Sequence, residues 1–314
     1  MSRRILVYYP DAREARAYAD LMRLPSRAFT VDVASTLAEA AGPGASAEIL
    51  YCWRPPPSVL ARAPQLRWIQ VMGAGVEQVL APELPGRVVV TRAAGIFGPW
   101  MAEYTLGWCL WTTQRMEGFR ASQRQRRWAP VDPIPLRGQT LCVVGLGDIG
   151  RAIARKARAL DLRVIGVTRT GRGPREAERV YRPRALRSAL ARADFVVLTV
   201  PLIATTRGLL GAAELAAMKP SAWLINIARG PIVEETALLE ALRARRIGGA
   251  VLDVFDAEPL PPEHPLWTLE NVAITPHISG PSTPREIAPI FNDNLRRYLA
   301  GRPLRHLVDR GRQY

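Results

Sequence analysis

Short apolar runs alternate with amphipathic stretches along most of the chain. In the first hundred residues, these runs predict β-strands at 5–9, 28–33, 48–53, 66–72 and 88–90. Between them, helical spacing predicts helices at 11–24 and 36–41 and from Ser58 onward. Strands that alternate with helices form parallel sheets, so this region predicts a small doubly wound α/β unit.

The same alternation continues in the second half of the chain. Further strands are predicted at 141–144, 163–167, 195–200, 222–226, 250–254 and 272–275, with helices between them such as 236–245. Residues 99–127 have the pattern of one long helix, and a last helix at 284–300 is expected to return to the first unit. The chain therefore predicts two Rossmann-like domains, one formed by residues 1–100 with 286–314 and the other by 101–285.

A glycine-rich turn follows the strand at 141–144. It has the spacing Gly145-x-Gly147-x-x-Gly150, and a helical pattern follows directly. The first glycine permits a tight turn, the second lets a pyrophosphate approach the backbone, and the third lets the helix pack against the strand. This context favours a dinucleotide site, which includes Asp148 and Ile149, over a structural turn that binds no nucleotide.

The end of the next strand bears on the choice of dinucleotide. An NAD site usually has an Asp or Glu there to bind the ribose 2′-hydroxyl, but no acidic residue occurs between Leu162 and Pro174. Basic and hydroxyl side chains that suit a 2′-phosphate stand there instead, namely Thr168, Arg169, Thr170 and Arg172. We therefore predict NADP in preference to NAD. The competing interpretation is that these arginines only share the basic character of the whole surface.

Three polar side chains lie just beyond three consecutive predicted strands. They are Arg229, Glu258 and His277, and in an open parallel sheet such positions face the ligand crevice. Each alone has a structural interpretation, as a surface arginine, a loop carboxylate or a core histidine. Their joint position beyond a dinucleotide turn favours a reaction site, with no metal ligand set in the chain.

These segments resemble the D-isomer-specific 2-hydroxyacid dehydrogenases along nearly the whole chain. The motifs on which this resemblance depends are the glycine turn, Asn226-x-Ala228-Arg229-Gly230, Asp253-Val-Phe-x-x-Glu258-Pro259 and Thr275-Pro-His277. Trp53-Arg54-Pro-Pro and Gly73-Ala-Gly75-Val-Glu are most similar to the glyoxylate/hydroxypyruvate reductase branch. The resemblance implies NAD(P)H-dependent reduction of a small 2-keto acid to the D-2-hydroxy acid.

The resemblance also implies roles for individual residues. Arg229 would hold the substrate carboxylate and keto oxygen, His277 would donate the proton, and Glu258 would pair with His277 and orient it. Further cofactor contacts are expected from Val200, Pro201, Ala228, Asp253 and His277 itself. The substrate pocket is expected to include Trp53, Arg54, Met72, Gly73, Ala74 and Gly75.

Two other functions stay open at this point. The same fold serves dinucleotide-sensing binding proteins that do not turn over substrate, such as transcriptional corepressors. Another dehydrogenase of the family, acting on phosphoglycerate or a bulkier keto acid, would carry the same three residues.

Composition narrows the expected partners. The net charge of +15 is almost entirely arginine, spread along the chain without a nucleic-acid-binding module, so we expect no nucleic-acid partner. A positive field suits a small anionic substrate. No apolar run approaches the length of a membrane span, and three cysteines in apolar contexts suggest a reducing cytoplasm. The family resemblance implies a homodimer formed through the nucleotide-binding domain, with 120–128 as a contact arm.

Overall fold

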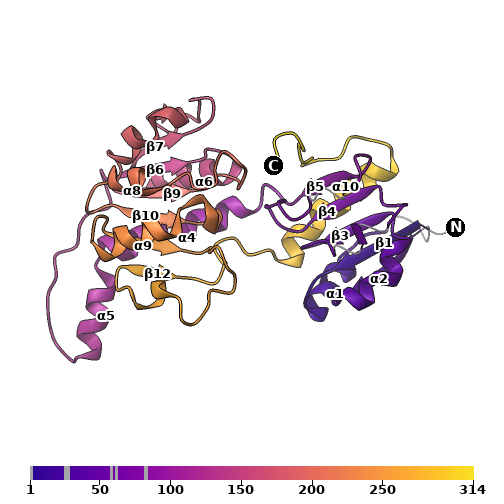
Figure 1. The fold of residues 1–314 in the computed structure, drawn as a ribbon, viewed down its shortest axis with the longest axis horizontal. Helices are drawn as coiled ribbons and strands as arrows, with labels where there is room; N and C mark the ends of the chain where they lie inside the picture. Colours follow the sequence, from indigo (N-terminus) through magenta and orange to yellow (C-terminus); the bar gives the residue numbers. More distant parts are fainter. Residues whose placement is uncertain (1–2, 25–28, 57–58, 61–62, 81–83) are drawn as a thin grey trace. The chain divides into compact units, whose positions relative to one another are not determined.

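The computed structural model divides the chain into two compact units (Figure 1). It describes residues 3–24, 29–56, 59–60, 63–80 and 84–314. Unit 1 comprises Met1–Ile96 and Ser282–Tyr314, and unit 2 comprises Phe97–Pro281. The chain thus passes from one unit to the other immediately before a helix that begins at Phe97, so the expected boundary after residue 100 falls inside that helix.

Unit 1 contains a five-stranded parallel sheet in the order β2-β1-β3-β4-β5. The strands are β1 (Arg3–Tyr8), β2 (Phe29–Ala34), β3 (Ile49–Cys52), β4 (Trp68–Val71) and β5 (Val89–Arg92). Its described helices are α1 (Ala12–Asp20), α2 (Leu37–Ala45) and α10 (Pro284–Leu299). This order is the doubly wound arrangement, as predicted. Residue 28 and the start of the helix expected from Ser58 lie outside the described residues.

Aromatic side chains join α10 to the sheet of unit 1. The ring of Phe291 stacks on Tyr51 of β3 at 4.2 Å and on Trp68 of β4 at 5.3 Å between centroids. Tyr18 of α1 meets Tyr51 edge-on at 5.5 Å, so α1 and α10 cover the same face. These rings are fully buried, which explains how the last helix belongs to the first unit.

Unit 2 contains a seven-stranded parallel sheet in the order β12-β11-β10-β9-β6-β7-β8. The strands are β6 (Thr140–Val144), β7 (Arg163–Val167), β8 (Arg179–Tyr181), β9 (Phe195–Leu198), β10 (Trp223–Asn226), β11 (Gly249–Leu252) and β12 (Val272–Ile274). The helices are α4 (Phe97–Thr113), α5 (Met116–Arg124), α6 (Asp148–Ala159), α7 (Leu186–Leu190), α8 (Ala212–Ala216) and α9 (Glu235–Arg243), with short 3₁₀ turns at Pro183–Ala185, Gly230–Ile232 and Pro265–Thr268. The strand order reverses between β6 and β9, where dinucleotides bind in this architecture.

The single helix predicted at 99–127 is wrong, because two helices occupy that stretch. Arg115 has a left-handed backbone with φ +55°, and α5 starts in a new direction after it. The hydroxyls of Thr112 and Thr113 turn back onto carbonyl oxygens of their own helix, at Trp108 and Cys109. Figure 1 shows α5 and the chain after it extending away from the sheet of unit 2.

The strand β8 was not predicted. It has three residues, Arg179 and Tyr181 among them, at the edge of the sheet beside β7. The guanidinium of Arg179 lies 4.8 Å above the ring of Tyr181.

None of the helices in the described part of the chain has the length and apolarity needed to span a bilayer.

Candidate active site

The glycine turn after β6 has the geometry that the motif requires. Gly145 has φ +103°, and a Cβ atom on it would lie 2.9 Å from a methyl group of Val200. A Cβ atom on Gly150 would lie 1.9 Å from the carbonyl oxygen of Gly145. At Gly147, which precedes α6, an added Cβ atom would meet nothing within 4 Å. The N-terminus of α6 therefore faces open space that would admit a phosphate.

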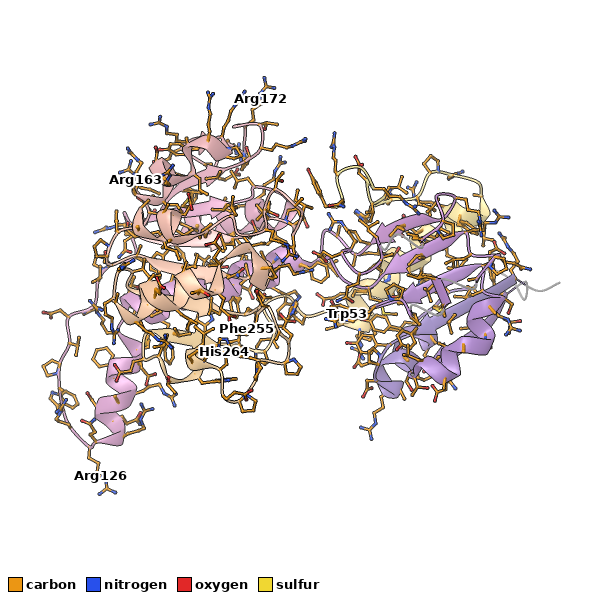
Figure 2. All side chains as sticks on the ribbon, in the orientation of Figure 1. Trp53, Arg126, Arg163, Arg172, Phe255 and His264 are labelled. Atoms are coloured by element: carbon orange, nitrogen blue, oxygen red, sulfur yellow. The ribbon has the colours of Figure 1, made fainter. Side chains whose placement is uncertain are left out.

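The segment after β7 forms a compact loop with two exposed arginines. The Thr168 hydroxyl donates to the carbonyl oxygen of Arg172 at 2.9 Å, and the backbone N–H of Arg172 donates to Thr170 Oγ1 at 3.3 Å. Thr168 is half-buried, and Arg169 and Arg172 are exposed. Neither arginine forms an ion pair within the described residues. Figure 2 shows Arg172 at the outer edge of unit 2.

A third arginine that the sequence analysis missed lies against this loop. Gly171 has φ +70°, and a Cβ atom on it would lie 2.9 Å from Cγ and 3.5 Å from Nε of Arg182. Arg182 directly follows β8. Because β8 was not predicted, nothing in the sequence placed Arg182 beside β7.

Arg229 follows β10 on a loop that is fixed by buried contacts. The side chain of Asn226, which is fully buried, donates to the carbonyl oxygen of Arg229 at 3.0 Å and accepts from the N–H of Ala228 at 3.1 Å. A Cβ atom on Gly230 would lie 2.1 Å from the backbone of Phe255, which Figure 2 labels. The loop after β10 therefore packs directly against the loop that carries Glu258.

Glu258 and His277 form a hydrogen-bonded pair. Nδ1 of His277 lies 2.9 Å from Oε2 of Glu258, and Oε1 accepts from the N–H of Phe255 at 3.0 Å. The side chains are 27% and 38% exposed for Glu258 and His277. With Nδ1 engaged, Nε2 is the ring nitrogen of His277 that remains available for a further hydrogen bond.

The electrostatic setting of Glu258 also involves Arg229. Burial by itself raises the pKa of Glu258. The hydrogen bonds from His277 and Phe255 and the positive charges of His277 and Arg229 outweigh burial, so the pKa of Glu258 is lowered. The carboxylate is therefore ionised at neutral pH. The charges of Arg229 and His277 both act on Glu258, so the structure connects the three predicted residues electrostatically.

The sequence predicts that Asp253 contacts the cofactor. In this structure its carboxylate accepts hydrogen bonds from groups of the protein itself. It is fully buried at the end of β11, and its oxygens accept from the Thr275 hydroxyl at 2.5 Å and from the N–H groups of Ile278 and Ser279, each at 2.9 Å. These contacts fix the segment that carries His277. A direct contact of Asp253 with the cofactor stays a prediction.

The half-buried His264 has a structural setting. Its Nδ1 accepts from the N–H of Leu266 at 3.3 Å, and its Nε2 lies 3.1 Å from a carboxylate oxygen of Glu235. Across the described residues, no cluster of three or more His, Cys, Asp or Glu side chains is arranged to hold a metal ion.

The predicted substrate residues of unit 1 gather at the carboxyl ends of β3 and β4. A Cβ atom on Gly73 would lie 3.1 Å from the ring of Trp53, so this ring packs against the loop at Gly73. Met72 is fully buried, and Ala74 and Gly75 are half-buried. A hollow of about 300 Å³ adjoins the ring, lined by Tyr9, Pro10, Asp11, Trp53 and Arg54.

Comparison with known proteins shows the family. Residues 106–279 match the NAD binding domain of the D-isomer specific 2-hydroxyacid dehydrogenases. The chain is 31% identical over 316 residues to a glyoxylate/hydroxypyruvate reductase A of Serratia proteamaculans, covering 97% of this chain and 98% of that protein. It is 36% identical over 232 residues to a glyoxylate reductase of Thermofilum pendens, covering 71% and 68%.

Solved structures of the family match this chain over its full length. An NADPH-dependent glyoxylate/hydroxypyruvate reductase from Sinorhizobium meliloti, in complex with NADP and sulfate, matches with a TM-score of 0.90 and 29% identity over 100% of both chains. A D-isomer specific 2-hydroxyacid dehydrogenase from Xanthobacter autotrophicus, in complex with NADPH and MES, matches with a TM-score of 0.86 and 33% identity over 100% of both.

The fold and the site thus define a nicotinamide-dependent oxidoreductase. The chain belongs to the D-isomer-specific 2-hydroxyacid dehydrogenase family. The predicted membership of this family is confirmed. The predicted similarity to its glyoxylate/hydroxypyruvate reductase branch is confirmed as well.

Proposed function

We propose that this enzyme reduces a small 2-keto acid, such as glyoxylate or hydroxypyruvate, to the D-2-hydroxy acid with NADPH. The observation that carries the proposal is the His277–Glu258 pair at 2.9 Å, with the charge of Arg229 acting on the same carboxylate. Relatives named glyoxylate or glyoxylate/hydroxypyruvate reductase support the substrate class.

The chemistry follows from the donors in this neighbourhood. The guanidinium of Arg229 binds the substrate carboxylate and the keto oxygen with its rigid fork of N–H groups. His277 donates a proton from Nε2 to the keto oxygen as negative charge develops there, and Glu258 keeps the ring oriented through Nδ1. A nicotinamide dinucleotide held at the glycine turn of Gly145, Gly147 and Gly150 would supply the hydride for the substrate carbon.

The preference for NADPH over NADH is part of the proposal. Arg169 and Arg172 lie on the loop after β7, and Arg182 packs against that loop. No carboxylate occurs between Leu162 and Pro174. Guanidinium groups bind a 2′-phosphate, whereas an acidic residue there would repel it. The neighbour structures that contain NADP or NADPH support this preference.

We further propose a homodimer that uses the arm at 120–128 together with α5. Apolar side chains are exposed there, with Trp128 97% exposed, Met116 41% and Phe119 39%. Burial of such a surface against a second copy would remove it from water. Light scattering during gel filtration is expected to give twice the 34.7 kDa chain mass, and Phe119→Glu is expected to shift the protein toward the monomer.

A cytoplasmic location completes the proposal. The thiols of Cys52, Cys109 and Cys142 are all buried, and burial raises the pKa of each. Such thiols behave as core side chains and are suited to a reducing compartment.

The direct test is turnover with a panel of keto acids. Purified protein with NADPH is mixed with glyoxylate, hydroxypyruvate, pyruvate, a bulky 2-keto acid and the oxidised form of phosphoglycerate, and the loss of NADPH absorbance is followed. We expect the highest kcat/KM with glyoxylate or hydroxypyruvate and a product of D configuration. Tight NADPH binding without turnover of any member would indicate a dinucleotide-sensing protein instead. Preference for the phosphorylated or bulky acid would indicate another dehydrogenase of the family.

A further inference from the structure

We propose that Tyr104 is a positioning residue, which holds His277 in place for proton donation through Thr275 and Asp253. This inference rests on the function proposed above. Tyr104 lies on α4, far from His277 in sequence, and no sequence motif pointed to it.

Three hydrogen-bonding groups form a chain from α4 to the end of β11. The Tyr104 hydroxyl lies 2.6 Å from Thr275 Oγ1, which lies 2.5 Å from Asp253 Oδ1. A carboxylate that already accepts backbone N–H groups has only acceptor capacity to offer, so Thr275 donates to Asp253. Tyr104 must then donate to Thr275, so that both hydroxyl groups donate in the same direction, toward Asp253.

The end of this chain encloses the backbone of His277. Asp253 accepts from Thr275 on one side of His277 and from the N–H groups of Ile278 and Ser279 on the other. The N–H of His277 itself donates to the carbonyl oxygen of Asp253 at 2.9 Å. His277 has φ +54°, a left-handed conformation that is uncommon for residues other than glycine, and the hydrogen bonds to Asp253 hold the segment in it.

Tyr104 anchors this arrangement to a well-packed helix. Its ring meets Trp108 of the same helix at 6.2 Å, and a Cβ atom on Gly280 would lie 3.1 Å from Met101, one turn earlier on α4. Burial raises the pKa of Tyr104; its bond to Thr275 acts in the opposite direction, and the charge of Asp253 raises the pKa further. The hydroxyl therefore stays protonated, as a donor must.

Loss of the Tyr104 hydroxyl would leave Thr275 with a missing donor and the His277 segment with one tether fewer. The imidazole would then spend less time in line with the keto oxygen, which slows proton transfer more than it weakens cofactor binding. Loss of the Tyr104 hydroxyl is therefore expected to lower kcat more than it raises the Kd for NADPH.

The kinetic test uses Tyr104→Phe, Thr275→Val and Thr275→Ser. We expect kcat to fall about ten-fold in Tyr104→Phe and in Thr275→Val, with a change of about two-fold or less in the Kd for NADPH and a larger solvent isotope effect on kcat. Thr275→Ser keeps a hydroxyl and is expected to restore most of the rate. Tyr298→Phe is the matched control, because it removes a tyrosine hydroxyl that bonds Glu48 at 2.6 Å in unit 1, and it should leave kcat unchanged.

A double-variant comparison distinguishes positioning from a general structural role. In a His277→Gln background, adding Tyr104→Phe is expected to change the residual kcat less than two-fold, because the residue acts only through His277. A full ten-fold loss in that background, or an equal loss of NADPH affinity, would overturn the proposal.

A spectroscopic readout keeps the inference testable if the proposed function fails. The chain has three histidines, so the His277 ring signal is identified by its disappearance in His277→Gln. In Tyr104→Phe we expect this signal to shift or broaden while those of His264 and His306 stay in place. An unmoved His277 signal would refute the positioning role, whereas absence of keto-acid turnover by the unaltered protein would refute only the proposed function.

Discussion

The Nδ1 atom of His277 lies 2.9 Å from the Oε2 atom of Glu258, although the two residues follow different strands. Glu258 lies on the loop after β11, and His277 follows β12, which pairs with β11 in parallel. The carboxyl ends of parallel neighbours meet at one edge of a sheet, so the fold itself brings the carboxylate and the imidazole together.

Glu258→Gln is expected to change how stability depends on pH. The pKa of Glu258 is lowered in the folded protein, so its contribution is complete above the unfolded value of about 4.3 and is lost as the pH falls through the folded pKa. Urea unfolding at a series of pH values should therefore show the largest stability difference between the original protein and the variant near neutrality. A difference that grows toward acid would contradict the sign of this shift.

Arg229→Lys is expected to keep the charge but lose the two-pronged binding of the substrate. We expect kcat/KM for the keto acid to fall about 100-fold, on the order of 3 kcal/mol of transition-state stabilisation. Arg243→Lys, on the exposed side of α9, is the control and should leave kcat/KM unchanged. Equal kcat/KM values for the two variants would contradict the assignment of Arg229 to the substrate site.

Arg169→Asp is expected to reverse the cofactor preference. The new carboxylate would repel a 2′-phosphate and bind a 2′-hydroxyl, so kcat/KM should fall with NADPH and rise with NADH. Arg182→Gln should weaken NADPH binding and leave NADH binding unchanged. Arg163→Gln, at the opposite end of β7 from Arg172 (Figure 2), is the control. An unchanged ratio of NADPH to NADH activity in Arg169→Asp would refute this cofactor assignment.

Gly230→Ala is expected to destabilise unit 2 severely. The added methyl group would overlap the backbone at Phe255 and Asp256, which cannot yield as a flexible side chain would. We expect a loss of roughly 3 kcal/mol or more, measured by thermal or urea unfolding. Gly107→Ala, on α4 with nothing within 4 Å of the added methyl group, should be neutral or slightly stabilising. A fully stable Gly230→Ala would contradict the close packing of the two loops.

Much of the fold could be read from the sequence because its signals are local. The glycines at 145 and 150 occupy positions where a Cβ atom would collide, so the motif reports backbone geometry directly. Buried parallel strands such as β9 are continuous apolar runs, which the hydrophobic pattern also reveals.

The features that the sequence did not reveal depend on tertiary contacts. The break at Arg115 is a left-handed position occupied by a residue other than glycine or asparagine, so no local signal marked it. β8 is a three-residue edge strand containing an arginine, and Arg182 reaches the β7 loop only because that strand pairs there. Likewise, Tyr104 and Thr275 meet through the packing of α4, which no spacing in the chain encodes.

The most direct test of the central claim compares His277→Gln with His264→Gln. Both variants replace a histidine that is hydrogen-bonded to a glutamate, but only His277 is assigned to proton donation. With NADPH and hydroxypyruvate or glyoxylate, we expect kcat to fall at least about 100-fold in His277→Gln and to stay within a few-fold in His264→Gln. Undiminished turnover by a folded His277→Gln protein would contradict the account.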